Sequence, residues 1–178
     1  MATLLQKYRL FKGLCSGERA YTGPFYVILD LTRRCNLSCL GCRFHSKGSK
    51  RLAWGDQDII DFPFDWAEKL FSELRSINTR MLFLMGDGEP FLYPRIFDLI
   101  HTAKKFGLDV TVTTNGTLLN QVRARHIIDS GLDAIHVSLW ASSYEEYSKQ
   151  YPGIDPVNFE RVINGMKILS SLKAKKSD

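Results

Sequence analysis

Three of the four cysteines lie within one short stretch of the chain. Cys35, Cys39 and Cys42 occur as C-N-L-S-C-L-G-C, directly after the apolar run 25–31. Thiolates this close together, with no fourth cysteine beside them, indicate ligands of a metal ion or an iron-sulfur cluster rather than disulfide partners. Three protein ligands on a four-iron cluster leave one iron open to an exogenous molecule, as a catalytic zinc site keeps one position free. The spacing therefore predicts a site with an open coordination position.

Two other interpretations of these cysteines stay open at this point. His45 could complete a zinc site of the form C-x3-C-x2-C-x2-H, because zinc accepts sulfur and nitrogen ligands together. The three residues could also be unrelated buried thiols. Cys15 has no second cysteine at a ligand spacing, and we interpret it as an incidental free thiol.

Four short apolar runs predict four strands. They cover residues 26–29, 81–85, 110–113 and 134–139. Continuous apolar runs are typical of parallel strands that are buried on both faces.

Amphipathic helical patterns follow these runs in alternation. The helices are expected to begin near Asp65, Pro94, Asn120 and Pro156, and Gly107 and Gly131 should end the second and the third. The residues predicted to face inward are Trp66, Leu70, Phe71, Leu74 and Ile77; Ile96, Leu99, Ile100, Ala103 and Phe106; Val122, Ile127 and Ile128; and Phe159, Val162, Ile163, Met166, Leu169 and Leu172.

The segments before and between these elements carry weaker patterns. Residues 4–11 show a loosely helical pattern that Gly13 could stop, which predicts a leader helix covering the bottom or side of the domain. The segment through Tyr147, Tyr151 and Pro152 is expected to be a loop.

Polar groups follow the later strands where each strand ends. Gly86-Asp87-Gly88-Glu89-Pro90 comes after the second strand, Thr114-Asn115-Gly116-Thr117 after the third, and Ser138 at the end of the fourth. Glycines let the backbone approach a ligand closely, and Glu89 adds a carboxylate beside them. Alternating strands and helices predict an α/β fold with a parallel sheet, in which function collects at the carboxyl ends of the strands. These loops and the cysteine loop should therefore converge on one site.

The C-x3-C-x2-C spacing after a first strand resembles the signature of the radical S-adenosylmethionine (SAM) superfamily. The resemblance implies a [4Fe-4S] cluster on Cys35, Cys39 and Cys42, with the amino and carboxylate groups of SAM chelating the fourth iron. It also implies a one-electron reductant such as flavodoxin or ferredoxin. That electron cleaves SAM into methionine and a 5′-deoxyadenosyl radical, which takes hydrogen from a substrate.

The resemblance also implies roles for the polar loops. Gly88, Glu89 and Pro90 match the last three positions of the family's G-G-E-P element, which meets the amino group of SAM. Asp87 stands in place of the first glycine of that element, and Gly86 precedes it. Thr114, Asn115 and Ser138 look like the groups directed at the ribose or the methionine carboxylate, although ordinary turn chemistry would also explain them.

One position departs from the family pattern. The residue before the third cysteine is usually aromatic or bulky and borders the adenine, whereas here it is Gly41. The backbone at Gly41 can still hydrogen-bond to the base, and Phe44 is a candidate for a replacement aromatic face.

The resemblance covers nearly the whole chain and implies a partial TIM-like barrel. We expect residues 1–20 to form the leader helix and linker, and residues 21–178 to form a radical SAM core with about four of the usual six strand-helix units. The apparent lack of two units predicts an open edge that favours self-association or a complementing chain. The pattern is most similar to peptide- and cofactor-maturing members, and nothing in it identifies the substrate. A non-catalytic iron-sulfur or SAM-binding subunit and a zinc-stabilised α/β binding module are the alternatives.

Composition excludes some other classes. The chain has 178 residues, 44% of them hydrophobic and 24% charged, which suits one globular domain. No apolar run approaches the ~20 residues that span a bilayer, and no secretory signal is evident, so we expect a cytoplasmic protein without a membrane span. The net charge of +5 includes the terminal Lys173, Lys175 and Lys176, so it does not indicate nucleic-acid binding.

Overall fold

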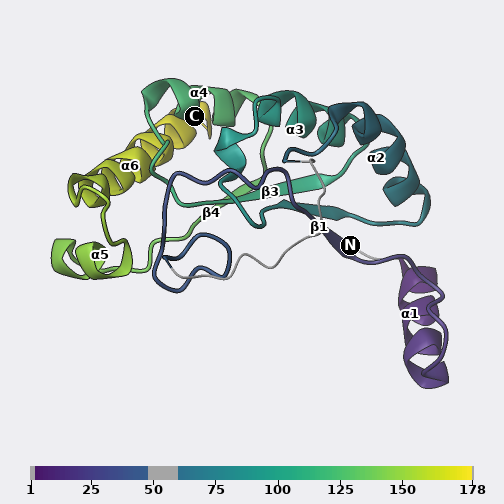
Figure 1. Ribbon diagram of the computed structural model, residues 1–178. Helices are drawn as coiled ribbons and strands as arrows, with labels where there is room; N and C mark the ends of the chain where they lie inside the picture. Colours follow the sequence, from purple (N-terminus) through teal and green to yellow (C-terminus); the bar gives the residue numbers. More distant parts are fainter. Residues whose placement is uncertain (1–2, 48–59, 178) are drawn as a thin grey trace.

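The fold is an α/β sheet covered by helices on one face (Figure 1). The computed structural model describes residues 3–47 and 60–177. The strands are β1 (Tyr26–Leu29), β2 (Met81–Leu84), β3 (Asp109–Thr114) and β4 (Ala134–Val137). The α-helices are α1 (Leu4–Ser16), α2 (Ala67–Ser76), α3 (Ile96–Lys105), α4 (Gln121–Asp129), α5 (Tyr144–Gln150) and α6 (Val157–Ser177), and short 3-10 turns span Phe64–Trp66 and Pro90–Leu92.

The four strands form one parallel sheet in the order β1-β2-β3-β4. The register places Val27 beside Leu82 and Val112 beside Ile135. The predicted α/β fold of parallel strand-helix repeats is therefore confirmed. Among the described residues, β1 and β4 each pair with a single strand, so the sheet is not closed.

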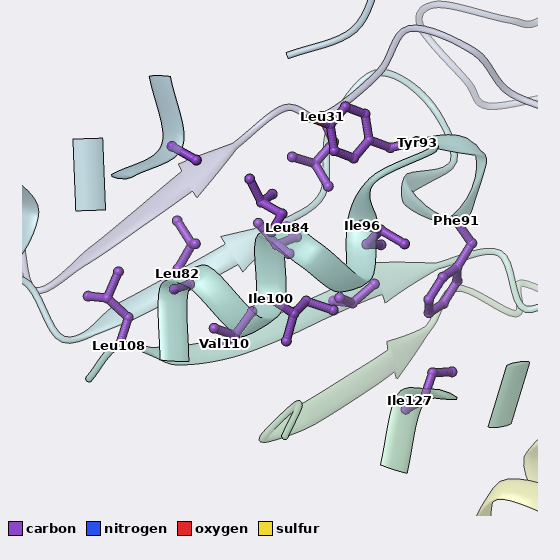
Figure 2. Close-up of a cluster of buried hydrophobic side chains, with 14 of the residues drawn as sticks. Leu31, Leu82, Leu84, Phe91, Tyr93, Ile96, Ile100, Leu108, Val110 and Ile127 are labelled. Carbon is purple, nitrogen blue, oxygen red and sulfur yellow. The ribbon is translucent and has the colours of Figure 1, made fainter. Parts of the chain in front are cut away.

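The hydrophobic core lies between the sheet and its helices (Figure 2). Leu82, Leu84, Val110 and Val112 are completely buried on the covered face. Leu99, Ile100 and Ala103 of α3 are also completely buried and belong to the same core cluster.

The opposite face of the sheet is not buried as the apolar runs predicted. Tyr26 and Ile28 of β1 are 54% and 53% exposed. Phe83 lies 5.5 Å from the Tyr26 ring and 6.5 Å from the His136 ring, so an aromatic row crosses this face. The prediction of strands buried on both faces was wrong for β1, because no layer of the described residues covers these side chains.

The first helix runs further than predicted and packs less. It continues through Gly13 to Ser16, and Gly17 ends it in the left-handed region at φ 68°. Cys15 therefore lies in the last turn of α1 and is exposed. None of the residues of α1 is buried, and the helix extends away from the sheet (Figure 1), so it does not cover the domain.

The inward faces of α2 and α4 were predicted to include residues that the structure shows to be exposed. Asp65 does not cap α2, because it lies in a 3-10 turn that precedes Ala67, and Trp66 there is 62% exposed. In α4, Val122 is 65% exposed and Ala124 is buried in its place. Asn120 does cap α4, with its side chain accepting a hydrogen bond from the Arg123 N–H at 2.9 Å.

The predicted loop after β4 contains a helix. The Ser143 side chain accepts a hydrogen bond from the Glu146 N–H and caps α5, and this Ser-x-x-Glu pattern was a signal in the sequence. Tyr147, in the middle of α5, and Tyr151, directly after the helix, are 1% and 2% exposed. Within the described residues, no helix is both long enough and apolar enough to cross a membrane.

The core predicts a contrast between two leucines. Leu99→Ala should lower the free energy of unfolding by about 2–5 kcal/mol, because Leu99 is completely buried between α3 and the sheet. Leu14→Ala should change it by less than about 0.5 kcal/mol, because Leu14 is 73% exposed on α1. Urea denaturation of both variants is the measurement, and equal losses would contradict this core.

Candidate functional site

The three clustered cysteines lie on one loop that follows β1. All three are half-buried. The Cys42 N–H donates to the Cys39 carbonyl at 3.0 Å, which closes a turn between the second and third cysteines. The Cys42 Sγ accepts from the N–H groups of Phe44 and His45 at 3.4 and 3.3 Å.

The surroundings of the other two cysteines disfavour negative charge. Burial raises the pKa of Cys39 to about 11, and the neighbouring Cys35 and Cys42 add to this shift. Burial also raises the pKa of Cys35. The three thiols share one loop, and a bound cluster would supply the positive charge that their thiolate forms need. The donor set therefore fits an iron-sulfur cluster.

His45 faces the loop after β2. Its Nε2 lies 2.8 Å from the Asp87 carbonyl oxygen, so the imidazole joins the cysteine loop to the glycine-containing loop. Within residues 3–47 and 60–177, no three His, Cys, Asp or Glu side chains are grouped as ligands of a single metal ion.

The glycines after β2 let two segments of the backbone come close together. Gly86 and Gly88 both lie against the segment 30–34 that follows β1. A Cβ at Gly88 would overlap the carbonyl oxygens of Thr32 and Arg34. The neighbouring Glu89 N–H donates to the Arg34 carbonyl at 2.8 Å. Gly86, at φ 142°, lies against Asp30 in the same way. These contacts fix the start of the cysteine loop against the loop after β2.

Glu89 is buried beneath the site, with 1% of its surface exposed. Its Oε1 accepts from the Thr114 hydroxyl at 2.6 Å and the Phe91 N–H at 3.1 Å, and its Oε2 accepts from the Asn115 N–H at 2.7 Å. Burial raises the pKa of Glu89 above its ordinary value, although these donors oppose the shift. The carboxylate thus joins the end of β2 to the end of β3.

A side-chain network joins the loop after β3 to the cysteine loop. The Asn115 Nδ2 donates to the Asn36 Oδ1 at 2.8 Å, and the Asn36 Nδ2 donates to the Thr117 hydroxyl at 2.8 Å. The Asn115 Oδ1 in turn accepts from the Thr117 hydroxyl at 2.7 Å. Asn36 carried no motif signal, so sequence reasoning missed it.

Ser138 brings the end of β4 to the same place. Its N–H donates to the Thr114 carbonyl at 2.8 Å, and its carbonyl accepts from the Tyr151 hydroxyl at 3.2 Å. The loops after the four strands therefore do converge, as predicted.

Gly41 lies against an aromatic ring, although not the one that was suggested. A Cβ at Gly41 would lie 3.1 Å from Cζ3 of Trp140. The exposed indole of Trp140 thus occupies the space beside Gly41, the residue before the third cysteine, and the role of Phe44 as an aromatic face stays a prediction.

Two buried tyrosines, Tyr147 of α5 and Tyr151 directly after it, pack against the cysteine loop. Leu37 is buried with Tyr147 and Tyr151, and Cys35 and Cys39 pack against this cluster. The Leu40 N–H also donates to the Gln150 carbonyl at 2.8 Å. The two tyrosines gave no sequence signal for a site, because their role depends on a helix that the sequence analysis missed.

Comparison with known proteins identifies the class that this fold and site define. The model of the radical SAM superfamily matches residues 29–177. The chain belongs to the radical SAM superfamily.

Two curated relatives show how much of such proteins this chain represents. It is 34% identical over 114 residues to the tungsten-containing aldehyde ferredoxin oxidoreductase cofactor-modifying protein of Pyrococcus furiosus, covering 64% of this chain and 30% of that protein. It is 30% identical over 146 residues to the AdoMet-dependent heme synthase of Methanosarcina barkeri, covering 82% of this chain and 39% of that protein. The chain thus spans well under half the length of these relatives.

Solved structures show the same fold. The structure of anSMEcpe with bound AdoMet matches 83% of this chain and 41% of its own, with a TM-score of 0.65 at 19% identity. Streptococcus suis SuiB bound to S-adenosylmethionine matches 92% of this chain and 36% of its own, with a TM-score of 0.65 at 16% identity.

The hydrogen bond from Thr114 to Glu89 predicts a pH-dependent loss of stability. Thr114→Val should lower the free energy of unfolding by about 1–3 kcal/mol at pH 7, because a buried carboxylate loses a donor. Because the folded pKa of Glu89 is raised, its contribution is fully present below its ordinary pKa and is lost as the pH rises through the folded value. The variant raises that folded pKa further, so its deficit relative to the wild type should grow as the pH rises from the ordinary pKa of Glu89 through the folded one.

Urea denaturation across this pH range is the measurement. Thr113→Val is the matched control, because Thr113 lies on the same strand with its side chain on the other face of the sheet. A deficit that is independent of pH, or equal at both positions, would argue against this role of Thr114.

Proposed function

We propose that this chain forms part of the core of a radical SAM enzyme, with Cys35, Cys39 and Cys42 holding a [4Fe-4S] cluster. The observation that carries the proposal is the cysteine loop itself. Three half-buried thiols lie on one loop at the carboxyl end of β1, and the loop after β2 is packed against it through Gly88. When bound, the cluster and SAM supply a single electron and a cleavable sulfonium, which give methionine and a 5′-deoxyadenosyl radical for hydrogen abstraction.

The chain's own residues bind and orient in this proposal. The three thiolates bind iron, and one iron is left for the amino and carboxylate groups of SAM. The carbonyls of Gly86 and Gly88 would accept hydrogen bonds from the N–H groups of the SAM amine, and Pro90 follows them as the fixed start of a 3-10 turn. Glu89 supports this loop and does not contact SAM itself, because its carboxylate oxygens already accept three hydrogen bonds from within the protein.

Other groups at the strand ends complete the proposed site. The Thr114, Asn115 and Ser138 region orients the ribose and the methionine carboxylate, and the backbone of Gly41 hydrogen-bonds to the adenine. The network of Asn115 with Asn36 supports this assignment, because it holds an amide side chain beside the cysteine loop.

The proposal also covers the class of reaction, the electron donor and the association of this chain with others. The names of the two relatives, a cofactor-modifying protein and a heme synthase, support a cofactor-maturing reaction, and the likeness to SuiB, solved with a precursor peptide, supports a peptide-maturing one. In this proposal a cytoplasmic flavodoxin or ferredoxin donates the electron to the cluster. Association through the outer strands and the exposed aromatic face of the sheet, with a second copy or further polypeptide, also belongs to the proposal.

The cysteine assignment predicts a visible difference between variants. After anaerobic reconstitution with iron and sulfide, the wild type should show the broad visible absorption band expected of thiolate-bound clusters. Replacing Cys35, Cys39 or Cys42 by Ala should abolish that band and the bound iron. Cys15→Ala should leave both unchanged, because Cys15 is exposed on α1. Bound zinc without iron in anaerobically purified protein would instead favour the binding-module alternative.

The open iron predicts a response to SAM. Adding SAM to the reduced cluster should change its electron paramagnetic resonance spectrum, because the amino and carboxylate groups become iron ligands. The matched ligand is 5′-deoxyadenosine, which lacks both groups and should leave the iron signal in place. A spectrum that stays the same at saturating SAM would count decisively against SAM chelation.

A further inference from the structure

Trp140 is an exposed aromatic residue built into the rim of the site. Its side chain is 56% exposed, although an indole carries a large apolar surface. The ring lies against Gly41, where a Cβ would come within 3.1 Å of Cζ3. Gly41 thus leaves the space that the indole occupies.

The backbone of Trp140 is held in place by a buried side chain. The Trp140 N–H donates to the Tyr151 hydroxyl at 3.1 Å, and that hydroxyl donates to the Ser138 carbonyl at 3.2 Å. Tyr151 is 2% exposed, and its ring lies 4.3 Å from the ring of Tyr147. Trp140 is therefore positioned from the interior and is not a loose surface residue.

The position of Trp140 sets it beside both halves of the proposed cofactor site. Gly41 lies between Cys39 and Cys42 in the chain, so the indole borders the loop that we propose for the cluster. Ser138, two residues before Trp140, is hydrogen-bonded to Thr114 at the end of β3. A flat apolar surface thus borders the cysteine loop at Gly41 and follows directly on the end of β4.

We propose that the indole of Trp140 is the stacking surface for the adenine ring of SAM. This inference rests on the proposed function, because it requires SAM at this site. A purine has a π-face that stacks on aromatic side chains, and the exposed indole offers such a face at the rim. The amino and carboxylate groups at the other end of SAM are polar and do not stack on an apolar ring, so Trp140 should contribute to the binding of the adenosine end alone.

The test is anaerobic isothermal titration of the cluster-loaded protein with SAM, 5′-deoxyadenosine and methionine in turn. Trp140→Ala should weaken the binding of SAM and of 5′-deoxyadenosine about tenfold or more, the size expected for the loss of one stacked base. Methionine binding and iron content should not change. Trp140→Phe should restore most of the affinity, because it keeps an aromatic face.

Two further variants separate stacking from a general loss of structure. Tyr8→Ala is the matched control, because Tyr8 is also an exposed aromatic residue, at 61%, but lies on α1. It should bind all three ligands as the wild type does. Gly41→Ala keeps the indole and displaces it, since the new Cβ would crowd the ring, so it should weaken the two adenosine ligands selectively.

The outcomes distinguish this inference from the function beneath it. Wild-type affinity for SAM in Trp140→Ala, or an equal loss for methionine, would overturn the role of Trp140 and leave the proposed function standing. Wild-type protein that holds its cluster but binds no SAM would overturn the proposed function, and this inference with it.

Discussion

The packing of Gly88 against the carbonyls of Thr32 and Arg34 is the constraint on which the rest of the site depends. It brings two loops from neighbouring strands into backbone contact, and a side chain at position 88 would separate them. The hydrogen bond from the Glu89 N–H to the Arg34 carbonyl then fixes their relative register. The cysteines begin at the next residue, so the position of the thiols follows from this contact.

From that contact the hydrogen bonds of the site extend across the sheet. The buried carboxylate of Glu89 reaches Thr114 and Asn115 at the end of β3. The Asn115 side chain is hydrogen-bonded to Asn36 in the cysteine loop. Ser138, directly after β4, is hydrogen-bonded to Thr114 at the end of β3. A buried carboxylate is costly to leave without donors, so these contacts hold the strand ends together as well as shaping the site.

The same sheet has one covered face and one exposed face. Alternate residues of each strand pack under the helices, whereas Tyr26, Ile28 and His136 lie on the other side and are exposed. The site lies at the strand ends and draws on loops from both β1 and β4.

The amino-acid sequence by itself determined the order of the four strands and of the helices around them except α5, the parallel α/β class and the loops that form the site. Those features are local, because apolar runs, caps such as Asn120 and cysteine spacing are read within a few residues. Helix ends were less accurate where two signals competed, as at Gly13 and Gly17, since either glycine can stop a helix and only one takes the left-handed conformation.

Only the tertiary structure decided which partners the site residues meet. Glu89 was expected to face a ligand, and it lies beneath the site because β3 supplies a hydroxyl and an N–H that its carboxylate satisfies. Asn36 joins Asn115 from 79 residues away, and Trp140 fills the space at Gly41. Such contacts join segments that are distant in sequence, so no local pattern encodes them. They depend on how the packed sheet brings the strand ends together.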